Sequence, residues 1–115
     1  MVEYEKAKQP EDLDRFFLER ANSGDLEGVV ALYDPQAVLA FPSGELTIGR
    51  ENIRRVYGRL LANKTRFQGD VQPAIRNGDL ALTSTRLPGN ATTEVARRQE
   101  DGSWLWIIDQ PSVLK

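Results

Sequence analysis

An Asp-Gly pair near the C-terminus constrains the fold of this chain more than any other feature. Asp101-Gly102 is a dipeptide typical of two-residue hairpin turns, and strand-like runs of residues flank it on both sides. A two-residue turn at this place pairs Glu94 with Asp109 and Arg97 with Trp106. Residues 92–111 are therefore predicted to form a β-hairpin to which the rest of the chain attaches.

This pairing divides the hairpin into two faces, because side chains alternate along a strand. One predicted face holds Glu94, Ala96, Leu105, Ile107 and Asp109. The other holds Val95, Arg97, Trp104, Trp106 and Ile108. Two carboxylates then lie opposite each other on a largely apolar face, where burial and repulsion are expected to keep one of them protonated at neutral pH. A three-residue loop with a bulge would shift the pairing by one residue and place Glu94 beside the tryptophans instead.

Apolar residues at helical spacing predict three helices before the hairpin. The first begins at Pro10 and ends near Gly24, the second follows Asp25 and stops at Asp34-Pro35, and the third runs from about Arg50 to Asn63. Their inward-facing side chains are expected to be Leu13, Phe16, Phe17 and Ala21; then Leu26, Val29, Val30 and Tyr33; then Ile53, Val56, Tyr57, Leu60 and Leu61.

The remaining segments show the period-two alternation of strands. A short hairpin is predicted between Val38 and Ile48, and alternation returns from Thr65 onward, with Asn77-Gly78 as a turn before a strand from Leu80 to Leu87. Helices followed by antiparallel strands predict an α+β domain. We expect residues 1–9 to be a flexible arm and residues 10–115 to form a single domain.

The composition excludes several chemistries. The chain contains no cysteine and no histidine, which removes disulfides, thiol nucleophiles, histidine bases and the usual zinc or iron sites. Any acid–base chemistry must therefore come from Asp, Glu, Tyr or Lys. A net charge of −2 and the lack of a long apolar run give no reason to expect binding to nucleic acid or to a membrane. A cytoplasmic location is compatible with these features.

Several motifs resemble the NTF2-like superfamily, which includes SnoaL-like and ketosteroid isomerase-like proteins. The resemblance covers roughly residues 10–112 and rests on residues 21–26, 32–38, 49–53, 93–98 and 101–109, which read ANSGDL, LYDPQAV, GRENI, TEVARR and DGSWLWIID. It implies a cone-shaped α+β roll, in which three N-terminal helices pack on a curved, mostly antiparallel sheet and a pocket opens at one end. It also implies a homodimer through the outer face of the sheet, here Val95, Arg97, Trp104, Trp106 and Ile108.

The same resemblance covers only half of the isomerase site. The position that matches the proton-shuttling aspartate of ketosteroid isomerases is Phe41, although Glu45 lies close to it in sequence. The second acidic group of those enzymes, a protonated donor to the developing oxyanion, falls on Glu94. Polyketide cyclases of this superfamily use a histidine with an aspartate, and this chain has no histidine.

The candidate catalytic residues are Glu94 and Asp109, as a carboxyl–carboxylate pair in a dry pocket. The candidate ligand-binding residues, which include two tyrosines whose hydroxyl groups would face the pocket, are Phe17, Tyr33, Leu39, Phe41, Tyr57 and Ile107. Alternatively, one acid points to solvent or is neutralised by an arginine (Arg86, Arg97 or Arg98), and the tyrosines and apolar residues simply belong to the core.

Three functions remain open at this point. The first is an isomerase, cyclase or lyase that acts on a small apolar carbonyl compound without a cofactor or metal, with a hydrolase using a carboxylate-activated water as a variant. The second is a domain that binds a small apolar ligand without catalysis. The third is a dimerisation module whose pocket is filled by its own side chains. The carboxylate pair favours the first, and the phenylalanine at position 41 favours the other two.

Overall fold

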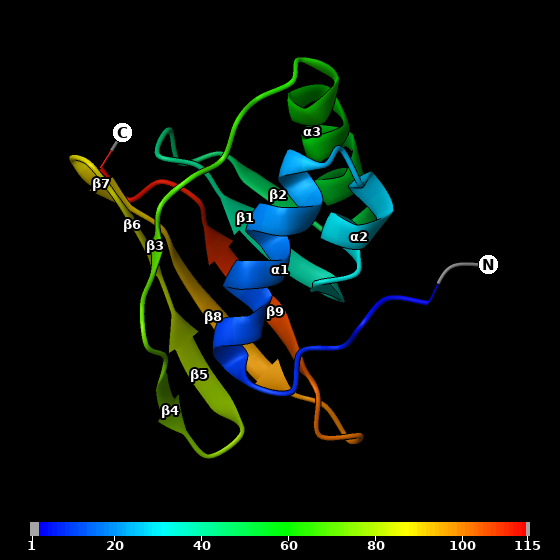
Figure 1. Ribbon diagram of the computed structural model, residues 1–115, viewed down its shortest axis with the longest axis vertical. Helices are drawn as coiled ribbons and strands as arrows, with labels where there is room; N and C mark the ends of the chain where they lie inside the picture. Colours follow the sequence, from blue (N-terminus) through cyan, green and yellow to red (C-terminus); the bar gives the residue numbers. More distant parts are fainter. Residues whose placement is uncertain (1–2, 115) are drawn as a thin grey trace.

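The computed structural model describes residues 3–114 and has the predicted α+β architecture (Figure 1). Its helices are α1 (Pro10–Asn22), α2 (Leu26–Val30) and α3 (Arg50–Ala62). Its strands are β1 (Tyr33–Ala40), β2 (Leu46–Ile48), β3 (Asp70–Val71), β4 (Ile75–Asn77), β5 (Leu80–Thr83), β6 (Thr85–Leu87), β7 (Asn90–Ala91), β8 (Thr93–Arg98) and β9 (Trp104–Gln110).

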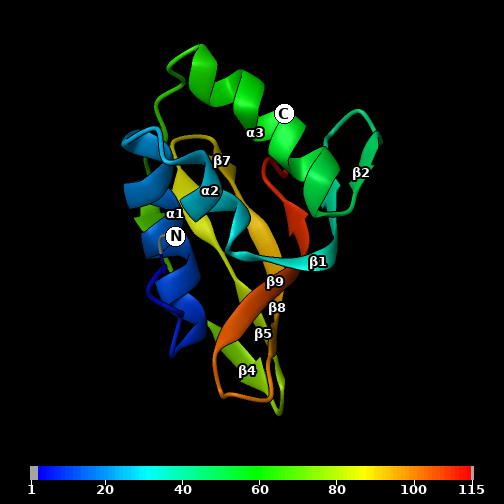
Figure 2. The same ribbon diagram turned by 90° about the vertical axis from the view of Figure 1, so that its right-hand side faces the viewer.

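The strands form two sheets. The larger has the order β2-β1-β9-β8-β5-β4, in which β1 and β9 are parallel and the other pairs are antiparallel. The smaller has the order β3-β6-β7. The helices gather on one face of the larger sheet, and its opposite face is left uncovered (Figure 2). This arrangement confirms the predicted mostly antiparallel sheet with helices on one side.

Local signals in the sequence explain the helix boundaries. Pro10 occupies the first turn of α1, and the Asp12 carboxylate accepts hydrogen bonds from the backbone N–H groups of Lys8 and Gln9. The Asp25 side chain accepts from the N–H of Gly28 and caps α2. The prediction that α2 carries Tyr33 was wrong, because α2 ends at Val30 and Tyr33 is the first residue of β1.

The C-terminal hairpin has a different turn from the one predicted. The N–H of Gln99 donates to the carbonyl of Ser103, which leaves a three-residue loop with Gly102 at a φ of +86°. Pairing is thus shifted by one residue near the loop, where Arg97 faces Leu105 rather than Trp106. A bulge after Val95 then restores the predicted register, so that Glu94 does face Asp109.

This double shift moves the tryptophans to the inner face. Trp104 and Trp106 are 1% and 2% exposed, so their predicted place on the outer, dimer-forming face was wrong. They join the core between the sheet and the helices, which also contains Leu13, Phe16, Val29, Leu32, Leu39 and Ile53. The backbone of Trp104 also donates to the carbonyl of Ala7, which attaches the N-terminal segment to the hairpin.

An apolar row replaces the tryptophans on the outer face. Cross-strand neighbours on all six strands of the larger sheet form this row, here called the outer row: Ile48, Val38, Ile108, Val95, Leu82 and Ile75. Ile48 and Ile75 at its two ends are 58% and 69% exposed, and Ile108 near its middle is 48% exposed. Within the described chain, nothing covers this row.

The predicted strand from Leu80 to Leu87 is broken at Ser84, which separates β5 from β6. The hydroxyl of Ser84 donates to the carbonyl of Thr92, and the N–H of Thr85 donates to the hydroxyl of Thr92. Side-chain groups thus replace ladder hydrogen bonds at this place. The chain passes here from the larger sheet to the smaller one, beside the residues that line the cavity described next.

Candidate active site

A cavity of about 260 Å³ lies between the helices and the inner face of the sheets. It is slightly smaller than the ~300 Å³ at which ordinary ligand sites begin, and it suits a small molecule. Its walls are contributed by α1, α3, the segment after α3, the end of β1 and the C-terminal strands. The lining residues are Asp14, Phe17, Leu18, Phe41, Tyr57, Leu60, Arg66, Phe67, Gln68, Thr85, Leu87, Thr92, Glu94, Trp106, Asp109 and Pro111.

The inner face of the sheet places two acids side by side. Thr83 on β5, Glu94 on β8 and Asp109 on β9 are successive cross-strand neighbours. Glu94 is 3% exposed and Asp109 is 4% exposed. The predicted pair is therefore buried on one face, and none of the ion pairs in the described structure involves either acid. Arg86, Arg97 and Arg98 do not neutralise them.

Each of these two acids is held by its own chain of hydrogen-bond donors. The indole N–H of Trp106 donates to the Thr83 hydroxyl over 3.0 Å, and that hydroxyl donates to Glu94 Oε1 over 2.6 Å. The Tyr33 hydroxyl donates to Asp109 Oδ2 over 2.5 Å. Tyr57 lies 3.0 Å from the Tyr33 oxygen and is left as the donor of that pair, since a hydroxyl has one proton.

A third acid, Asp14 on α1, faces the same cavity. Asp14 is 3% exposed, and the charge of Glu94 acts on its carboxyl group. Its Oδ2 atom has no hydrogen-bond partner, the only such buried side-chain atom among residues 3–114. A buried carboxyl oxygen without a partner is costly, so this atom marks a place where a ligand can bind.

The pKa of each of the three acids is raised. Burial, followed by repulsion from Glu94, raises the pKa of Asp14 to about 9. Burial also raises the pKa of Glu94, but hydrogen bonds from Asp14, Thr83 and Thr92 oppose that rise. Burial and the charge of Glu94 raise the pKa of Asp109 well above its usual range, while the Tyr33 hydroxyl lowers it. Asp14 receives no donor chain and is therefore the group best suited to carry the proton.

The structure brings together five of the eight predicted site residues. Glu94, Asp109, Phe17, Phe41 and Tyr57 line the cavity. Tyr33 does not line it and instead supports Asp109 from behind. Leu39 on β1 is fully buried beside Asp109 of β9 and belongs to the core. Ile107 lies at the hairpin bulge and does not line the cavity. Placing Leu39 and Ile107 in the pocket was therefore wrong.

Sequence reasoning missed Asp14, although a signal for it existed. Asp14 precedes Phe17, Leu18 and Ala21 at spacings of three, four and seven residues, which puts it on the same face of α1. A charged residue on an otherwise apolar helical face is rarely found without a partner. That mismatch alone would have pointed to a buried acid on the first helix.

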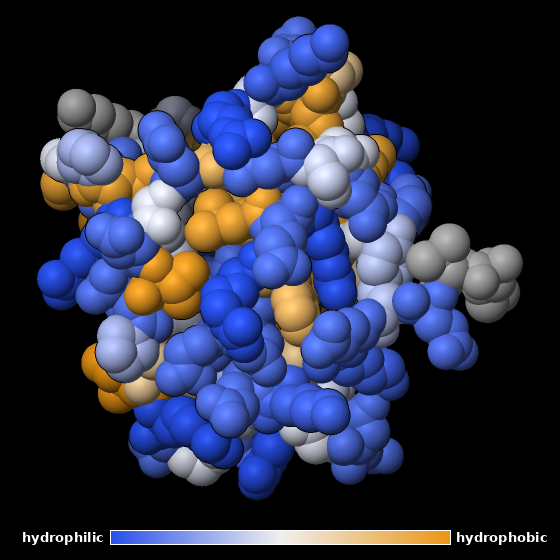
Figure 3. Space-filling model, viewed as in Figure 1, coloured by the Kyte–Doolittle hydropathy of each residue, from blue (hydrophilic) through white to orange (hydrophobic). Residues whose placement is uncertain are grey.

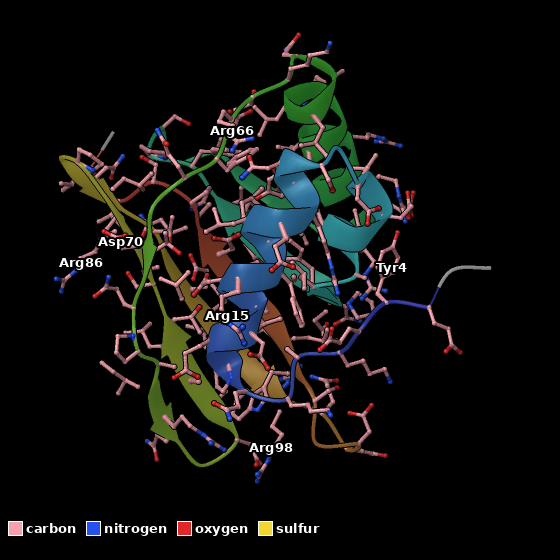
Figure 4. The ribbon with its side chains drawn as sticks, viewed as in Figure 1. Tyr4, Arg15, Arg66, Asp70, Arg86 and Arg98 are labelled. Carbon is pink, nitrogen blue, oxygen red and sulfur yellow. The ribbon has the colours of Figure 1, made fainter. Side chains whose placement is uncertain are left out.

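Aromatic rings form much of the remaining wall. Phe17 contacts Tyr57, Phe67 and Trp106, with ring centroids 5.6, 5.1 and 6.1 Å apart. The Asn22 side chain fixes Phe67 by donating to its carbonyl and accepting from its N–H. Neighbouring Arg66, on the segment between α3 and β3 (Figure 4), is exposed to solvent. In the space-filling view this side of the molecule is mostly hydrophilic, with separate apolar patches near its middle (Figure 3).

Residues 3–114 contain no group of three or more His, Cys, Asp or Glu side chains arranged to hold a metal ion. In the same part of the chain, none of the helices has the length and apolar character that crossing a membrane requires.

Known structures share this architecture at low sequence identity. A domain of unknown function with a cystatin-like fold from Nostoc punctiforme has a TM-score of 0.73 and 20% identity over 91% of this chain and 75% of its own. A ketosteroid isomerase-like protein from Erwinia carotovora atroseptica has a TM-score of 0.71 and 18% identity over 91% and 94%. An NTF-2 like protein of unknown function from Shewanella oneidensis has a TM-score of 0.70 and 16% identity over 86% and 92%.

Identities this low show the fold alone. A comparison with curated proteins found no match. The sequence profile of the SnoaL-like domain, by contrast, matches residues 13–109, which include Asp14, Glu94 and Asp109. The chain therefore belongs to the SnoaL-like domain family.

Proposed function

We propose that this protein binds a small, largely apolar molecule in the cavity and moves a proton on it without a cofactor, as an isomerase, cyclase or lyase does. One observation carries the proposal: three buried carboxyl groups face one cavity, and only two of them are held by internal donors. Acids whose surroundings separate their proton affinities in this way are suited to general acid and base roles.

The roles follow from the hydrogen bonds. Glu94 accepts from Thr83, which favours its carboxylate form and makes it the proposed base. Asp14 has no such donor, and its raised pKa makes it the proposed proton carrier. In the proposed step, Glu94 takes a proton from a carbon next to a carbonyl group while Asp14 donates a hydrogen bond to the oxygen on which negative charge develops. The proton then returns to a different carbon, and the carboxyl pair is restored.

Asp109 has a supporting role in this proposal. It lies directly across from Glu94 and accepts from Tyr33, which is backed by Tyr57. Its negative charge, when present, raises the proton affinity of Asp14. This arrangement revises the initial hypothesis, in which Glu94 and Asp109 alone formed the acid–base couple.

The test begins with a thermal-shift screen of small apolar ketones and ends with proton exchange. A ligand that raises the melting temperature is incubated with the protein in D₂O, and deuterium uptake at carbon is followed by NMR. Wild type and the control Asp70→Asn, an exposed acid on β3, are expected to exchange the proton. Asp14→Asn and Glu94→Gln are expected to bind but to lose at least a hundredfold in rate. Exchange at the wild-type rate in both site variants would refute the proposed roles.

A second candidate is ligand binding without catalysis. The specific observation in its favour is that Phe41 lines the cavity. In the resemblance to ketosteroid isomerases, the matching position carries the proton-shuttling aspartate. In that case ligands would raise the melting temperature of the wild type, but neither the wild type nor any variant would exchange a carbon-bound proton of the ligand. The same two measurements therefore separate the two candidates.

We also propose that two copies of the chain associate through the outer row. This row is apolar across six strands and includes residues that are half-exposed or more in the single chain. Such a face is too apolar to be left in water, and a two-fold axis would let each row cover the other. Ile108→Lys and Leu82→Lys are expected to give monomers in light scattering, while Leu114→Lys, outside the row, leaves the dimer intact. A wild-type monomer at micromolar concentration would contradict this proposal.

A further inference from the structure

The polar end of the cavity is acidic throughout. Asp14 on α1, Glu94 on β8 and Asp109 on β9 all line it, and Glu11 on α1 adds a more distant negative charge to Asp14. Among the described lining residues, Arg66 is the one basic side chain, and it is exposed to solvent rather than placed between the acids. The cavity thus gathers three carboxyl groups without an internal cation to balance them.

The hydroxyl groups that support Glu94 and Asp109 are already in use as donors. Thr83 donates to Glu94, Tyr33 to Asp109 and Tyr57 to Tyr33, so these hydroxyl protons are directed away from the space where a ligand would lie. Asp14 Oδ2, on a residue that is 3% exposed, is a buried side-chain oxygen of the described chain that has no hydrogen-bond partner. When Asp14 is ionised, a positive or hydrogen-donating group of a ligand satisfies this atom.

The apolar walls favour a positive ligand as well. Phe17, Tyr57, Phe67 and Trp106 line the same cavity as the acids, and Phe17 contacts the other three rings. Aromatic faces attract cations through their negative π-electron density, and the attraction strengthens where water is excluded. Carboxyl groups beside aromatic rings are the usual combination for recognising an organic ammonium ion.

We infer that the cavity selects a small organic cation, with an apolar body against the aromatic rings and an ammonium group against Asp14, Glu94 and Asp109. The inference rests on the proposed function only in that the cavity takes a ligand from solution. It also deepens that function, because an ammonium ion stabilises the charged form of one carboxyl group. The acids then lose one proton to the solvent, which leaves the mixture of acid and base that proton transfer requires.

Binding of such a cation depends on pH in a defined direction. Asp14, with a pKa of about 9, holds its proton at neutral pH, and the pKa of Asp109 is also raised. A bound cation therefore displaces a proton from the carboxyl groups, and its affinity increases as pH rises. Release of one proton gives up to a tenfold gain for each pH unit between pH 6 and pH 8.

The experiment compares two probes of the same shape. Benzyltrimethylammonium carries a permanent charge, and neopentylbenzene replaces its nitrogen with carbon. Dissociation constants are measured by the fluorescence of the tryptophans, one of which lines the cavity, at pH 6, 7 and 8. The wild type is expected to bind the cation at least tenfold more tightly than its neutral counterpart at pH 8, and this preference is expected to decrease toward pH 6.

Three variants locate the preference. Asp14→Asn and Glu94→Gln keep the side-chain shape and are expected to lose the preference for charge by tenfold or more, while Asp70→Asn keeps it. Equal binding of both probes, or tighter binding of the neutral one, would overturn the inference and leave the proposed function standing. So would failure of both probes to bind while a neutral ketone does. A charge preference without deuterium exchange would instead support the inference and refute proton transfer.

Discussion

The buried proton on Asp14 predicts a dependence of stability on pH that a single substitution should remove. The pKa of Asp14 is raised in the folded protein from an ordinary 3.8 to about 9, chiefly by burial. An acid whose pKa is raised by folding favours the folded state while it is neutral. Its contribution to stability is therefore complete below the ordinary pKa and is lost as pH rises toward the pKa in the folded protein. Each pH unit within this window weakens folding by about 1.4 kcal/mol.

Between pH 5 and pH 8 the loss assigned to Asp14 therefore amounts to about 4 kcal/mol. The Asp14→Asn variant has no proton to lose and should become more stable relative to wild type by this amount over that range. Urea unfolding at pH 5, 6, 7 and 8, followed by the fluorescence of the buried Trp104 and Trp106, measures the difference. Asp70→Asn serves as the control and should remain parallel to wild type.

Parallel curves for wild type and Asp14→Asn would refute the reasoning. They would mean that Asp14 is ionised in the folded protein at neutral pH, or that water reaches it. Either result removes the proton carrier from the proposed mechanism. The comparison needs no ligand and therefore tests the electrostatics of the site independently of its substrate.

Three further substitutions, one of them with a matched comparison at Gly78, test other parts of the structure. Gly69→Ala should destabilise the protein by about 1–3 kcal/mol, because a Cβ at its φ of +150° would lie 2.6 Å from Thr85 and 2.8 Å from the Arg86 carbonyl. Gly78→Ala, which has open space around it, should cost about 1 kcal/mol in the same unfolding assay. Tyr33→Phe removes the donor to Asp109, so the pKa of Asp109 should rise further in carboxyl NMR titrations, and an unchanged titration would contradict the donor chain. Asn22→Ala loses both hydrogen bonds to Phe67, so amide hydrogen exchange at Phe67 should become faster. Unchanged protection of this amide would disprove the prediction.

Features that depend on local signals could be predicted from the sequence. Pro10, Asp25 and the turn at Asn77-Gly78 mark boundaries by backbone chemistry that acts within a few residues, and the structure has its elements there. The aromatic wall residue Phe17 also followed from apolar spacing on the first helix. Tyr33 was misplaced because Asp34-Pro35 was taken as the end of a helix, whereas it lies within β1. Proline keeps the preceding residue out of the helical conformation, and the start of a strand satisfies this restriction as well as the end of a helix does.

The interaction between Asp14 and Glu94 depends on tertiary contacts and could not be found by pairing strands alone. Asp14 is 80 residues from Glu94 in sequence, and no local rule connects a residue on the first helix with one on β8. The hairpin directs attention to Asp109, which does lie across from Glu94. Yet a further interaction links Glu94 to Asp14, because the charge of Glu94 raises the pKa of Asp14. Only the packing of α1 on the sheet creates it.

The register of the hairpin shows why a correct pair can follow from an incorrect turn. The loop shifts the pairing by one residue and the bulge after Val95 shifts it back, so Glu94 still meets Asp109. Between the two shifts the faces are exchanged, and Trp104 and Trp106 turn inward. Residues 104–108 are all apolar, so they show no alternation that would fix which side is buried. The bulge resolves this by placing two large indole rings inside together with the acids, while Ile108 and Val95 take the outer row.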